Sequence, residues 1–295
     1  MFRFIAAERA TYPISLMCRL LGVSRSGFHA WLRRWPSKRW LQDVRLLELI
    51  HEIHAESRSS YGAPRIHAEL RARGVRVGRK RVERLMRRHG LSGLVKRRRD
   101  KTTIGVPGVR PAPDLVRRDF RPSGPDRLWV ADLTEISTWE GKLYLAVVLD
   151  CFSRRVVGWA MAEHMRAELV VEALEMGVRR RNPAAGLVHH SDQGSQYVSL
   201  VFGKRCREVG IDVSMGEKGS ALDNAVCESF FGSLKKELIR RRSWPTRAEA
   251  QTAVFEWIEG WYNRRRLHST LGYLSPAQYE EQIPLNQEMM EKEAA

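Results

Sequence analysis

Apolar residues in the C-terminal half of the chain fall into short runs typical of β-strands. Three such runs, rich in Val, Leu, Ile and aromatic residues, follow one another at 128–138, 142–153 and 154–163. The joints between them, Glu140–Gly141 and Ser153–Arg154, suit hairpin turns. The pattern therefore predicts three antiparallel strands in succession.

After these hairpins, segments with apolar residues at helical spacing alternate with two further strand-like runs. The strand-like runs are 186–192 and 211–216, and helical patterns cover 166–181, 199–210 and 246–263. Asn182–Pro183 ends the first of these helices. Three antiparallel strands followed by helix, strand, helix and strand predict an α/β domain with a mixed sheet flanked by helices.

The N-terminal half shows helical spacing only. Residues 13–35 read as two short helices broken at Gly22, and Ser24 can cap the second one. Two short helices joined at a glycine suggest a helix-turn-helix. Three further helices, two of them clearly amphipathic, are expected within 41–91. The sequence thus predicts an all-α, helix-turn-helix-type region ahead of the α/β domain.

Composition shifts suggest where these regions begin and end. We expect a helix-turn-helix-like segment at 1–40 and a basic helical DNA-binding domain at 41–94. A basic linker at 95–126 leads to the α/β domain at 127–280, and an acidic tail follows at 281–295. The linker is expected because 95–128 lacks periodicity and holds five of the chain's 12 prolines.

The positive charge of the chain is concentrated in its first part. The chain has 51 Lys and Arg against 34 Asp and Glu, a net charge of +17. Residues 1–120 alone carry 28 basic and 10 acidic residues, so the remainder is close to neutral. A block of this kind indicates a polyanionic partner, and nucleic acid is the first candidate.

The basic surface is expected to be densest on the third helix of the DNA-binding domain. Its apolar side holds Val82, Leu85 and Met86, and the opposite side is basic. Such a face suits a helix that lies against phosphates or in a major groove. The candidate DNA contacts are Arg79, Lys80, Arg84, Arg87 and Arg88.

Other features exclude some classes of protein. The four cysteines are scattered without zinc-ligand spacing, and the chain shows no secretory signal core or membrane-length apolar run. We therefore expect a soluble, intracellular protein that is not associated with a membrane.

Three carboxylates carry the candidate chemistry. Asp132 lies inside an apolar, β-prone run, Asp192 ends another, and Glu228 follows 35 intervening residues later in an amphipathic pattern. A carboxylate within a core strand is costly to bury unless a positive group lies against it. Brought together, three acids make an all-oxygen site suited to Mg²⁺ or Mn²⁺.

The segments LWVADLT, HHSDQGSQY and DNAVCESFFGSLKKE resemble the three acid motifs of DDE transposases and retroviral integrases. More closely, the chain resembles the OrfB protein of the bacterial insertion sequences that encode OrfA and OrfB in overlapping frames. The 35-residue gap, Lys235 seven residues after Glu228, and the segments YNRRRLHSTLGYLSPAQYE and YGAPRIHAELRARGVRVGRKRVERLMRRHGL carry this resemblance, which covers roughly residues 11–280.

The resemblance implies a ribonuclease H-like fold and a transposase that cleaves and joins DNA strands at the ends of an insertion sequence. Phosphoryl transfer of this kind uses two divalent ions about 3.5–4 Å apart. We expect Asp132 to bridge the two ions, with Asp192 and Glu228 each completing one site. The expected partners are terminal-repeat and target DNA, further copies of the chain, and an OrfA product that is separate or fused.

Several residues near these motifs have open roles. Asp150, His189 and His190 are candidates for the active site, although a structural role is expected for Asp150, and the two histidines would point to opposite faces of a strand. Lys235 shares a helix face with Glu228 and is expected to contact DNA. A second basic patch, expected to face phosphate, comprises Asn263, Arg264, Arg265, Arg266 and His268.

Two alternatives to a metal-dependent transposase stay open from sequence. One is a DNA-binding regulator that does no chemistry. The other is a nuclease or recombinase with a covalent tyrosine, for example Tyr262 beside the arginines at 264–266. Metal-dependent nicking would separate the first from a transposase, and a protein–DNA adduct formed without metal would support the second.

Overall fold

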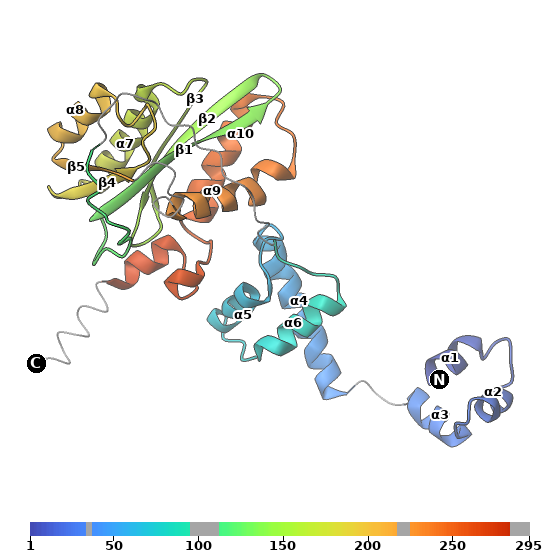
Figure 1. Cartoon of the computed structure of the whole chain (residues 1–295). Helices are drawn as coiled ribbons and strands as arrows, with labels where there is room; N and C mark the ends of the chain where they lie inside the picture. The colour runs from blue at the N-terminus through green and yellow to red at the C-terminus, as the bar shows by residue number, and fades with distance from the viewer. Residues whose placement is uncertain (34–36, 95–111, 217–224, 284–295) are drawn as a thin grey trace, which may run out of the picture.

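The computed structural model describes residues 1–33, 37–94, 112–216 and 225–283, which form three groups of elements along the chain (Figure 1). Most of the predicted linker, the residues just before the Glu228 helix and most of the acidic tail lie outside this described part.

The first group is a small bundle of three helices, α1 (Phe2–Glu8), α2 (Ile14–Leu20) and α3 (Arg25–Arg33). Its core consists of Ile5, Met17, Cys18 and Phe28. The helix break at Gly22 is confirmed, with a φ of 64° that glycine adopts without strain, and Ser24 Oγ accepts a hydrogen bond of 3.0 Å from Gly27 N. The sequence pattern does not predict α1. This helix buries a single residue, Ile5, so it lacks a clear apolar side.

The second group contains α4 (Lys38–Glu56), α5 (Ala63–Ala72) and α6 (Arg79–Arg88). These helices match the three expected within 41–91. Their apolar sides meet in one core that includes Ile50, Ile66, Leu70 and Val82, and Val82, Leu85 and Met86 are the buried residues of α6, as predicted.

The third group is built on a five-stranded mixed sheet with the order β3-β2-β1-β4-β5. The strands are β1 (Leu128–Thr138), β2 (Gly141–Asp150), β3 (Val156–Ala162), β4 (Leu187–Ser191) and β5 (Ile211–Met215). β1, β2 and β3 pair antiparallel, whereas β4 is parallel to both β1 and β5. The predicted strands and hairpins are therefore present.

Helices cover both faces of this sheet (Figure 1). On one face, α7 (Ala167–Arg181) and α8 (Leu200–Glu208) pack over Trp129 and Ala131. Gly158 allows β3 to approach α7 closely, since a Cβ there would overlap the Ala173 carbonyl oxygen and lie 2.7 Å from Gly177 N. This contact requires glycine.

On the other face, α9 (Ala225–Glu237) and α10 (Arg247–Phe255) pack over Val130 and Ile136. The helix predicted at 246–263 continues after α10 as a π-helix, η2 (Glu256–Tyr262), whose Trp257, Ile258 and Trp261 are buried as expected. Two short 3₁₀ helices, η1 (Ile239–Arg241) and η3 (Ser269–Leu271), complete the elements.

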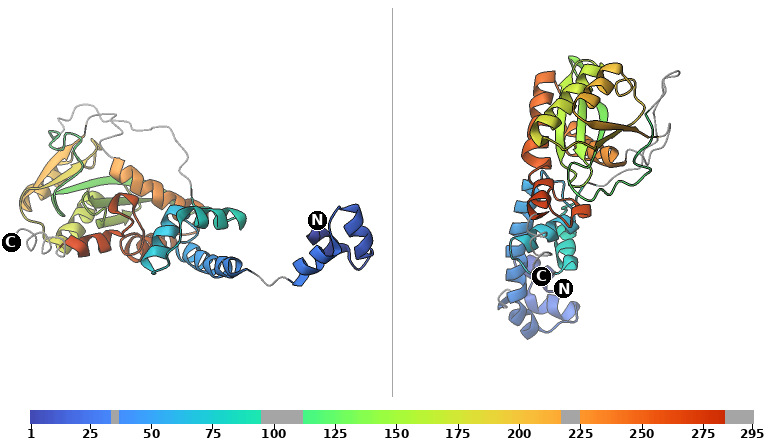
Figure 2. Two further views of the ribbon diagram at one scale, coloured as in Figure 1. Left: turned by 90° about the horizontal axis from the view of Figure 1, so that it is seen from below. Right: turned by 90° about the vertical axis from the view of Figure 1, so that its left-hand side faces the viewer.

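The second group lies against the third group (Figure 2), and hydrogen bonds join it to the segment that follows η2. The buried hydroxyl of Tyr61 accepts a hydrogen bond from Leu267 N at 2.7 Å and donates one to the Arg265 carbonyl oxygen at 3.3 Å. Arg65 Nε donates to the Leu267 carbonyl oxygen at 2.9 Å. The loop between α4 and α5 is therefore fixed against the α/β domain.

The mixed sheet flanked by helices, and the all-helical N-terminal region, confirm the predicted fold class. None of the described helices is both long and apolar enough to cross a membrane. All four cysteines are free and buried.

Candidate active site

The pairing of β1 with β4 brings Asp132 and Asp192 together. In this parallel pair Val130 lies opposite His190. Asp132 lies two residues further along β1, and Asp192 is the first residue after β4. The two carboxylates therefore come from neighbouring parts of the sheet, and the charge of Asp192 acts on Asp132.

The loop after β4 is held in place by its own hydrogen bonds. Asp192 Oδ1 accepts one from Gly194 N at 3.0 Å, and Gln193 Nε2 donates one to the Gly216 carbonyl oxygen at 3.0 Å. Gly216 N in turn donates to the Ser191 carbonyl oxygen at 3.1 Å. These bonds fix the direction in which the Asp192 carboxylate points.

Glu228 approaches the aspartates from α9, in the first turn of that helix. The neighbouring Cys227 is fully buried, and its thiol pKa is raised well above the usual value by burial and by the charges of Asp132 and Asp192. Glu228 itself is exposed. It thus lies at the open side of the site that the two aspartates line.

The pKa of Asp132 is shifted by its burial and by the neighbouring charges. Burial and then the Asp192 charge raise the pKa of Asp132 to about 7, and Glu228 raises it further. Leu133 N, at 2.7 Å from Asp132 Oδ1, and Lys235 oppose this shift. Burial also raises the pKa of Asp192. The site therefore concentrates negative charge, which is the condition that a divalent cation relieves.

The donor set fits a hard cation, because all three side chains offer carboxylate oxygens. Within the described part of the chain, no group of three or more His, Cys, Asp or Glu side chains is arranged so that it could hold a metal ion as it stands. Of the three predicted acids, both Asp192 and Glu228 are close enough to Asp132 for their charges to raise its pKa.

Lys235 occupies the position expected from its spacing. It lies in the last turn of α9, and its charge lowers the pKa of Asp132. Its ammonium group is also 6.0 Å from the centre of the Phe231 ring. A cation thus stands beside the carboxylates.

Tyr197 was missed by the sequence reasoning. Its ring is buried, and its pKa is raised well above the usual value by burial and by the charges of Asp132 and Asp192. Its buried ring, which packs against His189 and Phe202, is therefore within electrostatic reach of both aspartates. The sequence signal was its position only five residues after Asp192.

Asp150 has a structural role. It is fully buried and accepts hydrogen bonds from Asp126 N at 2.7 Å, Ser153 N at 2.8 Å and Ser153 Oγ at 2.9 Å. Its oxygens therefore fix the turn between β2 and β3.

The two histidines of β4 point to opposite faces, as predicted. His189 packs against Tyr197 and Phe202, and burial lowers its pKa to about 4. His190 Nδ1 lies 2.9 Å from Ser214 Oγ, and its ring contacts Phe120. Both rings are buried, which favours a packing role over a catalytic one.

Tyr262 is unsuited to be a nucleophile. It is buried among Phe230, Trp257 and His268, and burial raises its pKa. A covalent tyrosine mechanism at this position therefore finds no support.

The second basic patch is smaller than expected. Arg264 and Arg265 are exposed, but Arg266 is buried and forms an ion pair of 2.8 Å with Glu237. Asn263 is also buried, where it accepts a hydrogen bond from Val156 N at 2.9 Å and donates one to the Val156 carbonyl oxygen at 3.0 Å. Burial lowers the pKa of His268 to about 2, so this side chain is neutral. The expectation of a phosphate-facing role was wrong for Asn263, Arg266 and His268.

The basic face of α6 is partly neutralised by another helix. Asp43 of α4 pairs with Arg81 at 2.7 Å and with Arg84 at 3.0 Å. Arg87 pairs with Glu83 at 3.3 Å within α6. The remaining predicted contacts of this face, Arg79, Lys80 and Arg88, are exposed.

Sequence comparisons identify the kind of protein that carries this arrangement. Residues 122–221 and 209–276 match the family description "Integrase core domain", and residues 42–99 match "HTH-like domain". Transposase InsF for insertion sequence IS3A of Escherichia coli is 38% identical over 94% of this chain and 97% of that protein. The chain belongs to the IS3 family of insertion-sequence transposases. Members of this family are DNA transposases, so the activity is that of a polynucleotidyl transferase.

Further proteins are similar to this chain. The 31 kDa protein of insertion element IS600 from Shigella sonnei is 42% identical over 90% of this chain and 97% of its own length. The HTLV-2 integrase catalytic core domain, solved in complex with magnesium, is 18% identical over 54% of this chain and 99% of that chain, with a TM-score of 0.43.

Proposed function

We propose that this transposase cleaves and joins DNA strands at the ends of its insertion sequence, with Asp132, Asp192 and Glu228 as the catalytic carboxylates. The observation that supports this proposal is that the charges of Asp192, Glu228 and Lys235 all act on Asp132, whose strand β1 pairs in parallel with the strand that precedes Asp192. Like charges gathered in a buried site disfavour each other's ionisation, and a bound cation relieves that repulsion.

The same three carboxylates would hold two Mg²⁺ or Mn²⁺ ions. When bound, such ions activate the attacking oxygen and neutralise the leaving oxygen of a phosphoryl transfer. Asp132, which is nearest the centre of the charge cluster, would contribute to both ion sites. The raised pKa of Asp132 means that an ion must displace a proton at pH values below about 7.

Lys235 would hold the DNA beside the carboxylates. It lies seven residues after Glu228 on the same helix, and residues so spaced share a face. An ammonium group there can bind a phosphate next to the scissile one while also moderating the charge of the acids.

The terminal repeats would be bound by the helical region at 41–94, ahead of a catalytic domain at 127–280. The exposed Arg79, Lys80 and Arg88 of α6 suit phosphate contact, whereas Arg84 and Arg87 must first leave their acidic partners. Arg264 and Arg265 offer a second exposed basic site. Cutting at two ends further implies at least a dimer on DNA, with or without an OrfA product, in the bacterial cytoplasm.

The catalytic assignment is tested with labelled DNA that carries the ends of the insertion sequence, incubated with the full chain and Mg²⁺, with and without OrfA. Asp132→Asn, Asp192→Asn and Glu228→Gln should each abolish cutting and joining but leave DNA binding within a few-fold of wild type. Asp212→Asn, which alters an exposed acid of β5, is the matched control. Joining that survives in all three variants would refute the metal site, and binding by a chain that never cuts would favour a regulator.

The DNA-binding assignment is tested by salt titration of binding. Each phosphate contact contributes about 0.9 to the slope of log K against log salt. Replacing Arg79, Lys80 and Arg88 together by Gln should lower the slope by about 2–3. An unchanged slope would mean that this face of α6 does not contact phosphate.

A further inference from the structure

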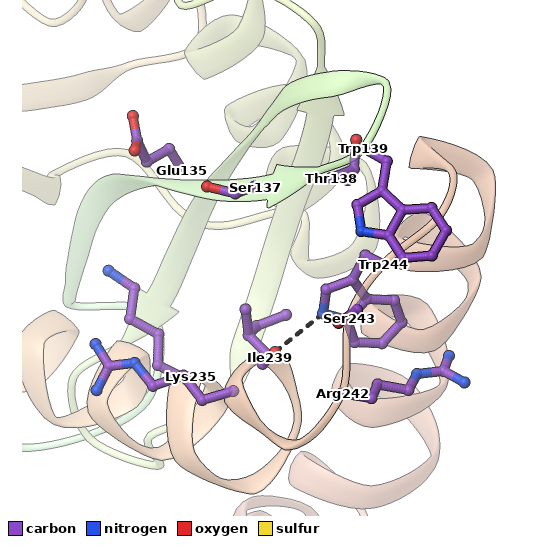
Figure 3. Close-up of a pocket in the computed structure, with 10 residues that line it drawn as sticks. Glu135, Ser137, Thr138, Trp139, Lys235, Ile239, Arg242, Ser243 and Trp244 are labelled. Atoms are coloured by element: carbon purple, nitrogen blue, oxygen red, sulfur yellow. Dashed lines mark hydrogen bonds between the residues drawn. The ribbon is translucent and has the colours of Figure 1, made fainter.

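A pocket of about 480 Å³ opens between the tip of the β1–β2 hairpin and the segment after α9 (Figure 3). Its lining includes Glu135, Trp139, Lys235, Arg240, Arg242 and Trp244. This volume falls within the range of about 300–1,000 Å³ that is common for sites that bind small molecules. The pocket therefore has the size for a ligand that combines an aromatic part with a charged one.

The walls of this pocket are fixed before any ligand binds. Trp139 N donates a hydrogen bond of 3.0 Å to the Trp244 carbonyl oxygen, which ties the hairpin tip to the segment after α9. Trp244 Nε1 donates one of 3.0 Å to the Ile239 carbonyl oxygen, drawn as a dashed line in Figure 3. A preformed pocket loses little entropy when a ligand enters.

The two tryptophans of the pocket differ sharply in exposure. Trp244 is 3% exposed and is covered by the Arg242 guanidinium, which lies 4.1 Å from its ring centre. Trp139, in contrast, is 76% exposed. A ring of this size stabilises a core or an interface strongly when it is buried. The Trp139 ring is therefore a free stacking surface on a rigid support.

The charges around this ring are predominantly positive. Lys235, Arg240 and Arg242 line the pocket together with one acid, Glu135, whose carboxylate pairs with Lys142 at 2.9 Å. A ligand that stacks on an aromatic ring and carries an anion would satisfy both features. Nucleotides have this combination, and aromatic side chains next to basic ones are how proteins bind unpaired strands.

The pocket adjoins the candidate active site through Lys235, which lies at its edge and also acts on the charge of Asp132. DNA held at the carboxylates would therefore pass the mouth of the pocket.

We propose that this pocket receives a nucleotide of the DNA end that has left its base stack, with its base against Trp139 and its phosphate near Arg240 and Arg242. The proposal rests on the function proposed above, because it assumes that a DNA end lies at the carboxylates. In this proposal the tip of the β1–β2 hairpin holds one DNA strand away from its complement, a role separate from that of the three acids. Stacking of one base on an aromatic ring strengthens binding by roughly 5- to 150-fold.

Photo-crosslinking tests where the base lies without requiring catalysis. End DNA with 5-iodouracil at successive positions near the cleavage point is bound to the full chain in EDTA, irradiated, and the adducts are mapped by mass spectrometry. We expect an adduct at Trp139 from one or two adjacent positions. Trp139→Ala should remove this adduct but leave all other adducts in place.

Two matched variants separate stacking from general DNA affinity. Trp139→Phe keeps an aromatic ring and should retain most of the strand-joining rate, whereas Trp139→Ala should lower it about tenfold. Phe255→Ala removes another exposed aromatic ring, 50% exposed at the end of α10, and should change neither adduct nor rate. Because Trp139 is exposed, the thermal midpoint of each variant should match that of wild type.

The outcomes separate this proposal from the proposed function. If adducts form elsewhere on the chain but none forms at Trp139 from any position, the pocket proposal is refuted. The proposed catalytic role of the carboxylates is not affected by that result. If the Trp139 adduct forms but cutting does not depend on Asp132, the pocket proposal stands and the proposed metal site is refuted. If Trp139→Ala instead abolishes binding of an OrfA protein and has no effect on adducts, the pocket binds protein rather than DNA.

Discussion

The charge cluster at Asp132 makes a prediction about stability that needs no catalytic assay. The pKa of this carboxyl is about 7 in the folded chain, against an ordinary value of 3.8. The folded state therefore binds a proton more tightly than the unfolded state between these two values. The contribution of this carboxyl to stability is most favourable below pH 4 and falls as pH rises through this window, and the full cost is reached above pH 7.

The size of this cost follows from the shift. Each pKa unit corresponds to about 1.4 kcal/mol, so a shift of roughly three units amounts to about 4 kcal/mol at most. Water reaches part of the side chain, which reduces the expected cost to about 2–4 kcal/mol. Asp132→Asn removes the charge and keeps the shape, so at pH 8 without metal this variant should be more stable than wild type by that amount.

The assay is urea unfolding of the full chain in EDTA at pH 4, 6 and 8, followed by tryptophan fluorescence. The advantage of Asp132→Asn should grow from near zero at pH 4 to its full value at pH 8. Adding Mg²⁺ at 100 times its dissociation constant should stabilise wild type by about 2.7 kcal/mol and the variant by much less. Asp212→Asn, on the exposed side of β5, should follow wild type at every pH.

Two results would refute this reasoning. An advantage that does not change with pH would mean that it does not come from the carboxyl charge. Equal stabilisation of wild type and Asp132→Asn by Mg²⁺ would mean that the ion binds elsewhere.

Three further predictions concern packing and buried polar contacts. Tyr61→Phe removes the hydroxyl that joins the helical region to the α/β domain and should lower the free energy of unfolding by about 1–3 kcal/mol, with faster proteolysis between the two parts. Glu237→Gln leaves the buried Arg266 charge without its partner and should cost about 3–5 kcal/mol in urea unfolding. Gly158→Ala forces a methyl group into the α7 backbone and should prevent folding, as seen by circular dichroism, whereas Gly232→Ala, in the open face of α9, should stabilise by about 0.5–1 kcal/mol.

The contrary outcomes are equally specific. Unaltered proteolysis of Tyr61→Phe would show that the two parts are not fixed by this hydroxyl. A cost for Glu237→Gln no larger than that of Glu83→Gln, which breaks an exposed pair, would show that water reaches Arg266. A folded Gly158→Ala chain would mean that β3 can move away from α7.

The strands and helices of the catalytic part could be predicted from sequence because apolar periodicity follows directly from which face is buried. The adjacency of Asp132 and Asp192 is different, since it depends on β4 pairing in parallel with β1, and local sequence does not specify strand order. The family resemblance, rather than the pattern, anticipated it.

Charged residues were harder to assign because their partners lie far away in the chain. Arg264, Arg265 and Arg266 are indistinguishable by type, yet only Arg266 meets Glu237, 29 residues earlier. Arg81 and Arg84 meet Asp43, which belongs to another helix. A run of arginines therefore predicts a basic segment but not which of its members reach solvent.

The amide of Asn263 has a consequence for how copies of this transposase can associate. β3 is at the margin of the sheet, and Asn263 occupies both main-chain hydrogen-bonding groups of Val156 that an added strand would use. At this point a second molecule cannot lengthen the sheet by strand addition. Another chain would have to displace the Asn263 amide before it could pair with this end of β3, so the side chain protects the strand against edge-to-edge association.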